Sequence, residues 1–526
     1  MYVVRIKMKN IYRMKKTTSL KGMLRMAAAA VLLILVAGCK TKENVRVHII
    51  GDSTMADYVE NTTHTRGWGE MLQSFFGPKV QVANYARGGR SSHSFYKEGL
   101  WKVVSDSIRP GDYVLIQFAH NDEKEGGKDG ADGRGTAPWT TYKKYIERYV
   151  DEARERKATP VLVTPIIRRY FTSDGTISPK GCHDLSVAPD DSTLNYVRVM
   201  KHVARNKNVQ LVDMTAATKD FAENLGSEQT IRCIYVPTDG THTQATGAAC
   251  YAKIAVEGLK DKGILARQIR DDIPLVLNPD RLDFKTIFEG EKSVVCFDLT
   301  GLNLTPAAGK LAVTAPKGML IADSPHGIAK QSLTYQYYDG KLWNKCFYLS
   351  FQPQKAGRVR ENVVITYGAS RKRLPVVAEV KEVSERLPVS LTVERPVLRG
   401  LVRAEQGITI EGNEWSAEID EAARRYVEVV VPPVENTVLL NSLSLYVDGE
   451  VAYRIACAYG KDFYPRTDIG EEQTPEKGRR NVTLPLNVTL NPGQKLHIRL
   501  FPWSTMASDN LHFTIGDWKV EGSIVK

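Results

Sequence analysis

Short apolar runs alternate with longer amphipathic segments from Val45 to about Lys262. The runs are VRVHII (45–50), VQVANY (80–85), YVLIQF (113–118), PVLVTP (160–165) and VQLVDM (209–214). Helical periodicity predicts helices near 67–76, 92–107, 140–157, 192–206 and 244–262. Strands that are apolar on both faces and are separated by helices are typical of a parallel sheet covered on two sides. The pattern therefore predicts a three-layer α/β/α domain with a central parallel sheet over residues 44–265.

Helical patterns disappear after residue 265, where period-two runs bounded by Gly, Pro and Asp replace them. Runs such as SVVCFDL, KLAVTA, KCFYLSFQP and RLPVVAEV predict an Ig-like β-sandwich over residues 270–385. A second group, including YVEVVV, LSLYVDG and KLHIRLFPW, predicts another β-sandwich over 388–526, for which carbohydrate binding is a candidate role. Several domains are also expected because single cores stop growing at roughly 250–300 residues and the chain has 526.

The first 38 residues have the pattern of a targeting segment. Residues 1–25 carry eight Lys or Arg and no acidic residue, and the apolar run MAAAAVLLILVAG follows, just before Cys39. A basic region followed by a short apolar stretch is typical of a secretory signal rather than a membrane span. Val36-Ala37-Gly38-Cys39 resembles a bacterial lipobox, which implies a lipoprotein signal peptide over 1–38 and lipidation of Cys39. We therefore expect a lipid-anchored protein of the bacterial cell envelope, with a plain signal peptide as the alternative.

Charge and cysteine usage exclude some classes of function. Removing the eight positive charges of residues 1–25 from the formal net charge of +12 leaves +4, and no helix-turn-helix or zinc-finger pattern is present, so we expect no nucleic-acid partner. None of the six cysteines after Cys39 forms a C-x-x-C pair, which disfavours structural zinc. Cys296 and Cys346 are a candidate disulfide in an oxidising compartment, and isolated buried thiols fit the spacing equally well.

The stretch Gly51-Asp52-Ser53-Thr54-Met55 directly follows the first predicted strand. Gly, Asp, Ser and Thr are ordinary loop residues, so this stretch alone fits either a turn or a nucleophilic Ser53. A nucleophilic serine needs a base to remove its proton and an acid to orient that base. His242 is the candidate base, and Asp239, three residues earlier, is the candidate orienting acid.

Donors for an oxyanion are candidates in two further loops. Gly88-Gly89 follows the second predicted strand and His120-Asn121-Asp122 follows the third. The backbone N–H of a glycine can approach a substrate closely because no Cβ intervenes, and the Asn121 amide can supply another donor. Ligands bind beyond the carboxyl ends of parallel strands, where all of these clusters are expected. Because all of these residues are expected at the same edge of the sheet, the pattern favours a nucleophilic Ser53 over a simple turn.

Residues 45–262 resemble the SGNH hydrolases, also called the GDSL-like family, in four ordered blocks: GDSTM, NYARGGRSS, QFAHND and TDGTH. Within that family they look most like the rhamnogalacturonan acetylesterase branch of carbohydrate esterases. The G-x-S-x-G elbow of the α/β-hydrolases is absent. Ala119 departs from the family pattern, which usually has Gly before His-Asn-Asp.

The resemblance implies an SGNH-hydrolase domain that acts as a serine esterase without a metal or cofactor. It implies that Ser53 is the nucleophile, that His242 is the general base and that Asp239 orients the base. It also implies an oxyanion hole made of the backbone N–H groups of Ser53 and Gly89 and the side chain of Asn121.

We expect removal of O-acetyl groups from pectic polysaccharide, with an acetylated poly- or oligosaccharide as the partner. The alternatives are another SGNH esterase (xylan acetylesterase, lysophospholipase or thioesterase) and a catalytically inactive glycan-binding lipoprotein.

Arginines on or near the loops are candidates to bind galacturonate carboxylates: Arg87, Arg90, Arg134, Arg168 and Arg169. Trp415, Trp503 and Trp518 fit either sugar stacking or a sandwich core. The segment 126–135 is expected to be a flexible loop near the site rather than a Ca²⁺ loop.

Overall fold

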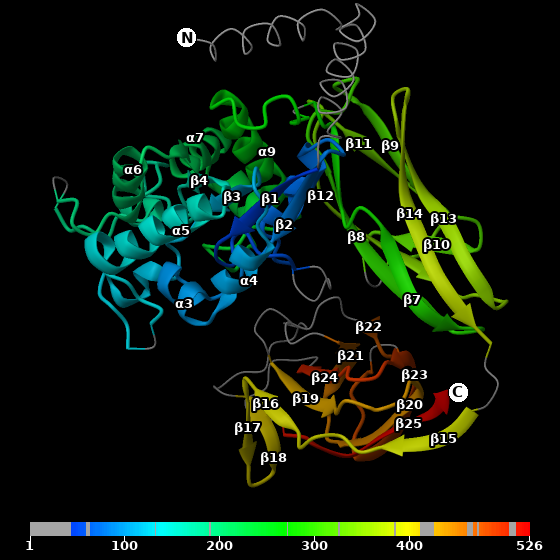
Figure 1. Ribbon diagram of the computed structural model, residues 1–526. Coiled ribbons are helices and arrows are strands. Elements are labelled where there is room, and N and C mark those ends of the chain that lie inside the picture. The colour runs from blue at the N-terminus through cyan, green and yellow to red at the C-terminus, as the bar shows by residue number, and fades with distance from the viewer. Residues whose placement is uncertain are drawn as a thin grey trace, which may run out of the picture.

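The computed structural model describes residues 44–525 apart from 59–63, 132, 189–190, 271, 325–326, 383–385, 411–424, 460–466, 471–472 and 504–511. The predicted signal peptide, Cys39 and Trp415 lie outside the described residues. Figure 1 shows an α/β domain with a first β unit (275–381) beside it and a second β unit (386–525) below. Within the described part of the chain, no helix is long and apolar enough to cross a membrane.

A five-stranded parallel sheet forms the centre of the α/β domain, in the order β2-β1-β3-β4-β5. Its strands are β1 (Val45–Ile50), β2 (Val80–Asn84), β3 (Tyr113–Ile116), β4 (Thr159–Val163) and β5 (Gln210–Val212). Side chains alternate between the two faces of a strand, so the neighbours Ile49 and Ile50 enter different apolar clusters. The two clusters lie on opposite faces, and the predicted α/β/α fold is confirmed.

Helices cover both faces of this sheet (Figure 1). The cluster around Ile49 includes residues of α2 (Trp68–Met71), α7 (Met214–Leu225) and α9 (Ala245–Asp261). The cluster around Ile50 includes residues of α3 (Ser92–Lys97), α4 (Leu100–Ser107), α5 (Lys143–Glu155) and α6 (Tyr196–Asn206). The sequence pattern did not predict α7, and it merged α3 and α4, which Gly99 separates with a left-handed φ of 78°.

The first β unit is a sandwich of two sheets, β10-β12-β8-β6 and β11-β9-β13-β14-β7. Its strands are β6 (Leu275–Asn278), β7 (Leu282–Phe288), β8 (Ser293–Gly301), β9 (Gly309–Thr314), β10 (Met319–Ala322), β11 (Ser332–Tyr337), β12 (Leu342–Phe351), β13 (Gly357–Tyr367) and β14 (Ser370–Lys381). Phe297 and Phe347 of the first sheet and Val363 and Val376 of the second belong to one buried cluster. Alternate residues of both sheets therefore fill a single core.

The second β unit is also built from two sheets, β15-β25-β20-β23 and β16-β19-β24-β21-β22, with the hairpin β17-β18 beside them. Its strands are β15 (Arg386–Leu391), β16 (Val397–Arg399), β17 (Leu401–Ala404), β18 (Gly407–Ile410), β19 (Tyr426–Val431), β20 (Val438–Asp448), β21 (Ala452–Ala458), β22 (Thr467–Asp468), β23 (Arg479–Leu490), β24 (Leu496–Trp503) and β25 (Thr514–Val525). Trp503 is buried, so it is not an open platform for a sugar ring, and Trp518 is partly buried against the core. Two C-terminal β modules thus follow the α/β domain, as the pattern predicted.

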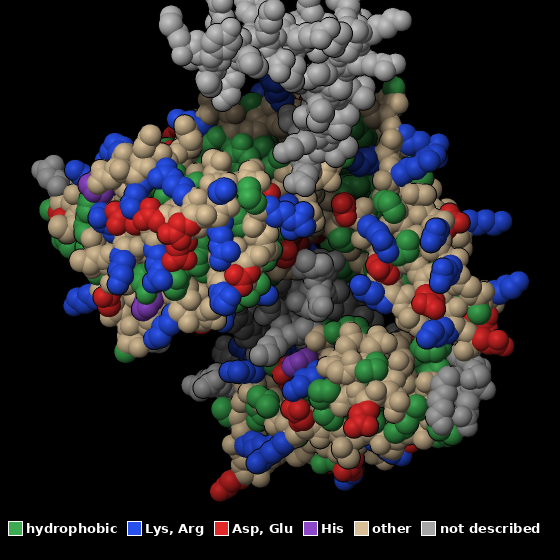
Figure 2. All heavy atoms as spheres, in the orientation of Figure 1, with side chains coloured by type: hydrophobic (Ala, Val, Ile, Leu, Met, Phe, Trp, Pro, Cys, Tyr) green, Lys and Arg blue, Asp and Glu red, His purple; other side chains and the backbone are tan. Residues whose placement is uncertain are grey.

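The surface and the cysteines add two observations. Lys and Arg side chains are interspersed with Asp and Glu on the face shown in Figure 2, which carries no extended patch of one sign. None of the six described cysteines forms a disulfide. Cys296 and Cys346 lie on the paired strands β8 and β12, where each is opposite another residue, so the candidate disulfide between them is wrong.

Candidate active site

Ser53, His242 and Asp239 form a continuous chain of hydrogen bonds, although Ser53 and His242 are 189 residues apart. The Ser53 Oγ lies 2.8 Å from Nε2 of His242, and the other ring nitrogen, Nδ1, lies 2.6 Å from Oδ2 of Asp239. The second carboxylate oxygen of Asp239 accepts the backbone N–H groups of Thr241 and His242, at 2.7 and 3.2 Å. This arrangement orients the imidazole so that one nitrogen faces the serine hydroxyl.

The carboxylate of Asp239 is suited to hold the imidazole in this orientation. Burial opposes its ionisation, but the hydrogen bond and charge of His242 hold the pKa of Asp239 well below its usual range. The side chains of His242 and Asp239 remain 28% and 37% exposed, so a substrate can reach this edge of the sheet.

A tight turn after β1 presents Ser53. Oδ1 of Asp52 accepts the backbone N–H of Thr54 at 2.9 Å and its hydroxyl at 2.7 Å, and the N–H of Met55 bonds to the Asp52 carbonyl at 3.2 Å. Gly51 has to be a glycine here, because a Cβ would lie 2.7 Å from the backbone carbonyl oxygen of Gln117. The turn predicted from GDSTM therefore exists and also carries the candidate nucleophile.

The loops after β2 and β3 meet beside this turn. Gly89 has a left-handed φ of 80°, and a Cβ on the preceding Gly88 would lie 3.7 Å from Cβ of Ser53. Asn121 donates through Nδ2 to the carbonyl of Arg90 at 3.1 Å and accepts a hydrogen bond from Nη2 of Arg134 at 3.1 Å. Because Nδ2 carries two protons, one remains to serve an oxyanion.

The backbone N–H groups of Ser53 and Gly89 find no acceptor among the described residues. Donors of an oxyanion hole must have no hydrogen-bond acceptor within the protein, so that they can donate to the oxyanion when it forms. Ala119, the departure from the family pattern, lies within an apolar cluster with its methyl group fully buried. The methyl group at this position is therefore accommodated in the core beneath Asn121.

The loop after β4 holds the loop that carries His242. Arg169 donates through Nε to the Asp239 carbonyl at 3.1 Å and through Nη2 to the Pro237 carbonyl at 2.5 Å. Arg168 is buried, and its Nε lies 2.7 Å from Oε1 of Glu123. The expectation that Arg168 binds a galacturonate carboxylate is therefore wrong, because its guanidinium already has an internal carboxylate partner.

Two buried histidine–carboxylate pairs lie beneath the site, and sequence reasoning did not find them. Nδ1 of His120 lies 3.1 Å from Oδ2 of Asp52, Nδ1 of His183 lies 2.9 Å from Oε2 of Glu123, and the two rings meet edge to face at 4.5 Å. Burial lowers the pKa of His120 to about 4. Burial opposes ionisation of Glu123 as well, but His183 and Arg168 lower its pKa to about 2.

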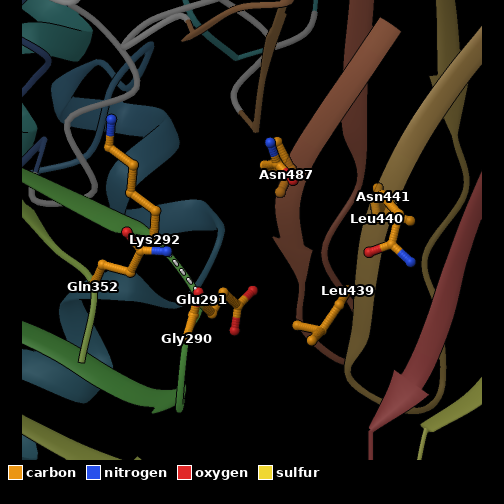
Figure 3. Close-up of a pocket in the computed structure, with 9 residues that line it drawn as sticks. Gly290, Glu291, Lys292, Gln352, Leu439, Leu440, Asn441 and Asn487 are labelled. Carbon is orange, nitrogen blue, oxygen red and sulfur yellow. Dashed lines mark hydrogen bonds between the residues drawn. The ribbon is translucent and has the colours of Figure 1, made fainter. Parts of the chain in front are cut away.

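Other candidate sites lie elsewhere or carry no chemistry. The described residues contain no group of three His, Cys, Asp or Glu side chains placed to hold a metal. In the loop 126–135, Asp129 accepts the backbone N–H of Ala137 at 2.9 Å and the hydroxyl of Thr141 at 2.8 Å, so its carboxylate is hydrogen-bonded to the segment before α5. A cavity of about 350 Å³ lies between the two β units. Figure 3 shows Lys292 and Gln352 on one side of it and Asn441 and Asn487 on the other.

Comparisons with known proteins find relatives of the α/β domain. Residues 49–249 match the GDSL-like Lipase/Acylhydrolase family. The chain is 34% identical over 235 residues to the rhamnogalacturonan acetylesterase RhgT of Bacillus subtilis, over 42% of this chain and 93% of that one. It is 28% identical over 229 residues to a rhamnogalacturonan acetylesterase of Emericella nidulans, over 42% of this chain and 88% of that one. The solved structure of protein YxiM from Bacillus subtilis matches 42% of this chain and 57% of its own, at 26% identity and a TM-score of 0.36.

The fold and the comparisons define a carboxylic ester hydrolase of the SGNH class. The chain belongs to the GDSL-like lipase/acylhydrolase family, and its α/β domain carries the match.

Proposed function

We propose that the protein removes O-acetyl groups from pectic polysaccharide, with acetylated rhamnogalacturonan as the substrate class. The observation that carries the proposal is the hydrogen-bonded chain from Ser53 through His242 to Asp239. The substrate class is supported by the names of two relatives, both rhamnogalacturonan acetylesterases.

The proposed reaction has two halves. In the first, Oγ of Ser53 attacks the acetyl carbonyl while Nε2 of His242 accepts the serine proton, and that proton then passes to the departing sugar hydroxyl. In the second, water gives a proton to His242 and attacks the acetyl-enzyme, and His242 passes that proton to Oγ of Ser53 as the acyl–oxygen bond breaks and acetate leaves. The N–H groups of Ser53 and Gly89 and the amide of Asn121 stabilise the oxyanion in both halves, each donor contributing about 3 to 4 kcal/mol.

Arg134 gives the site a positive charge that suits an acidic polysaccharide. Its guanidinium donates to the Asn121 side chain at 3.1 Å, and Nη2 would lie 3.4 Å from a Cβ placed on Gly89. A cation at this place can attract a galacturonate carboxylate as the acetyl group enters. We propose this role for Arg134 rather than for the buried Arg168.

We also propose that a lipid on Cys39 anchors the enzyme to the membrane of the bacterial cell envelope. Metabolic labelling with a fatty-acid probe should mark the wild type and leave Cys39→Ala unlabelled. Equal labelling of both chains would contradict the anchor without affecting the proposed reaction.

The first experiment is acetate release by residues 41–526, which include every described residue. The substrates are acetylated rhamnogalacturonan, acetylated xylan, p-nitrophenyl acetate and p-nitrophenyl octanoate, with Ser53→Ala as the blank. Release from the pectic polymer that disappears in the variant is the expected result. A clear preference for xylan would indicate a xylan acetylesterase, and a preference for octanoate would indicate a lipase-type activity. No detectable hydrolysis of any of the four substrates would indicate a glycan-binding protein.

A further inference from the structure

The candidate base His242 lies between two threonines that are each held by an arginine. On one side, Nη1 of Arg168 donates to the hydroxyl of Thr241. On the other, the Thr243 hydroxyl donates to the Arg66 carbonyl at 2.7 Å, and the Arg66 N–H donates to the Thr243 carbonyl at 2.8 Å. The backbone on both sides of His242 is thus attached to other segments.

Arg168 joins the histidine loop to the loop that carries Asn121. Besides Thr241, its guanidinium contacts the carbonyl of His120 at 3.0 Å, one residue before Asn121. Glu123 balances the charge at 2.7 Å, and the other Glu123 oxygen is held by His183 at 2.9 Å. A single buried cation therefore spans the base and one proposed oxyanion donor.

Arg66 joins the same histidine loop to the first β unit. Its Nε lies 2.8 Å from Oδ2 of Asp298 in β8, which is 232 residues away, and the two side chains are only 2% and 11% exposed. A second contact lies nearby, where Asn278 of β6 donates to Glu70 at 2.6 Å. The first β unit therefore supplies the nearer of two carboxylates around a buried arginine whose backbone holds Thr243, the other being Glu70 of α2 at 3.9 Å.

We propose that Arg168 and Arg66 are positioning residues for His242, and that the first β unit takes part in catalysis through Asp298. The inference rests on the proposed function, since it assumes that His242 is the general base. The imidazole has to stay between Asp239 and Ser53, and displacement of a catalytic group by about 1 Å can cost on the order of a hundredfold in rate. Loosening either attachment should lower kcat and leave KM nearly unchanged.

The Arg168 attachment is tested with a matched pair of variants at Thr241. Thr241→Val keeps the side-chain shape and removes the hydroxyl, whereas Thr241→Ser keeps the hydroxyl. We expect kcat on p-nitrophenyl acetate to fall about tenfold in the valine variant with KM within about twofold, and the serine variant to restore most of the loss. Equal kcat in the two variants would overturn the role of Arg168.

The Arg66 attachment is tested in the same way with Thr243→Val and Thr243→Ser. The link to the first β unit is tested with Asp298→Asn, Arg66→Gln and the double variant. If the two side chains act as one anchor, the double variant should lose no more kcat than the worse single variant, because the effects of coupled residues are not additive. Additive losses would show that the two side chains do not act as one anchor. Normal kcat in Asp298→Asn would show that the β unit has no part in the reaction.

One further readout separates this inference from the proposed function. The proton on Nδ1 of His242 should give a far-downfield NMR signal, which Asp239→Asn removes and which Thr241→Val makes exchange faster with water. If the wild type is inactive but the signal responds in this way, the proposed function fails and the positioning stands. If the wild type is active and the signal is the same in Thr241→Val, only the positioning fails.

Discussion

The exposed pair His242–Asp239 and the buried pair His120–Asp52 have the same chemical composition and different surroundings. In the exposed pair, the side chains are 28% and 37% accessible, and the second ring nitrogen of His242 faces the hydroxyl of Ser53. In the buried pair, the accessibilities are 2% and 0%, and Nε2 of His120 has no hydrogen-bond partner among the described residues. A histidine–carboxylate pair is therefore not a catalytic signature without a nucleophile and a route for substrate.

The surroundings also change the protonation chemistry. Burial lowers the pKa of His120 to about 4, so its imidazole stays neutral near pH 7 and does not cycle protons there. The exposed pair can exchange protons with a substrate. In the buried pair, His120 holds the Asp52 carboxylate, which in turn holds the turn that presents Ser53. We therefore expect the same substitution to affect mainly catalysis in the exposed pair and mainly stability in the buried pair.

The largest contrast is expected between His242→Gln and His120→Gln. His242→Gln removes the proposed base, so kcat on p-nitrophenyl acetate should fall about 10⁵-fold, while the half-exposed position should leave the melting temperature close to that of the wild type. His120→Gln should lower the melting temperature by several degrees and reduce kcat far less. Steady-state kinetics gives kcat and thermal unfolding gives the melting temperature of both variants. Comparable kcat losses in the two would contradict a catalytic role for one pair and a structural role for the other.

Asp239→Asn and Asp52→Asn form the second contrast. The first should lower kcat about 10⁴-fold, because an amide does not fix the tautomer that leaves a basic nitrogen facing Ser53. The second replaces a buried carboxylate that accepts bonds from Thr54 and His120, so its main effect should be on the free energy of unfolding. An unfolding midpoint unchanged in Asp52→Asn would argue against a structural role for the buried pair.

The smallest effect is expected from acid on the Glu123 cluster. The pKa of Glu123 is about 2 in the folded protein against an ordinary 4.5, so its contribution to stability is present above pH 4.5 and is lost as the pH falls toward 2. That contribution is on the order of 3 kcal/mol. The difference in unfolding free energy between the wild type and Glu123→Gln should shrink between pH 5 and pH 3 in urea titrations. A difference independent of pH would mean that Glu123 is not held ionised by His183 and Arg168.

Most of the α/β domain could be predicted because its strands carry a strong local signal. Each run, such as VRVHII, is apolar on both faces, and the structure places β1 over the same six residues, Val45–Ile50. The helix α7 was missed because its sequence, MTAATKDFAENL, has only weak apolar periodicity and directly follows a run read as a strand to Met214. The role of Arg168 was misjudged because a loop position in the sequence does not reveal burial.

The sequence by itself determined the order of the strands and loops and the presence of Ser53, Gly89, Asn121, Asp239 and His242 at the loops that follow them. Local periodicity and short motifs are enough for that, because they depend on neighbouring residues. Only the tertiary structure decided which of the histidine–carboxylate pairs faces solvent, and that Asp298 forms an ion pair with Arg66 from another unit. Burial and ion pairing between residues 232 positions apart depend on how distant segments pack, which no local pattern records.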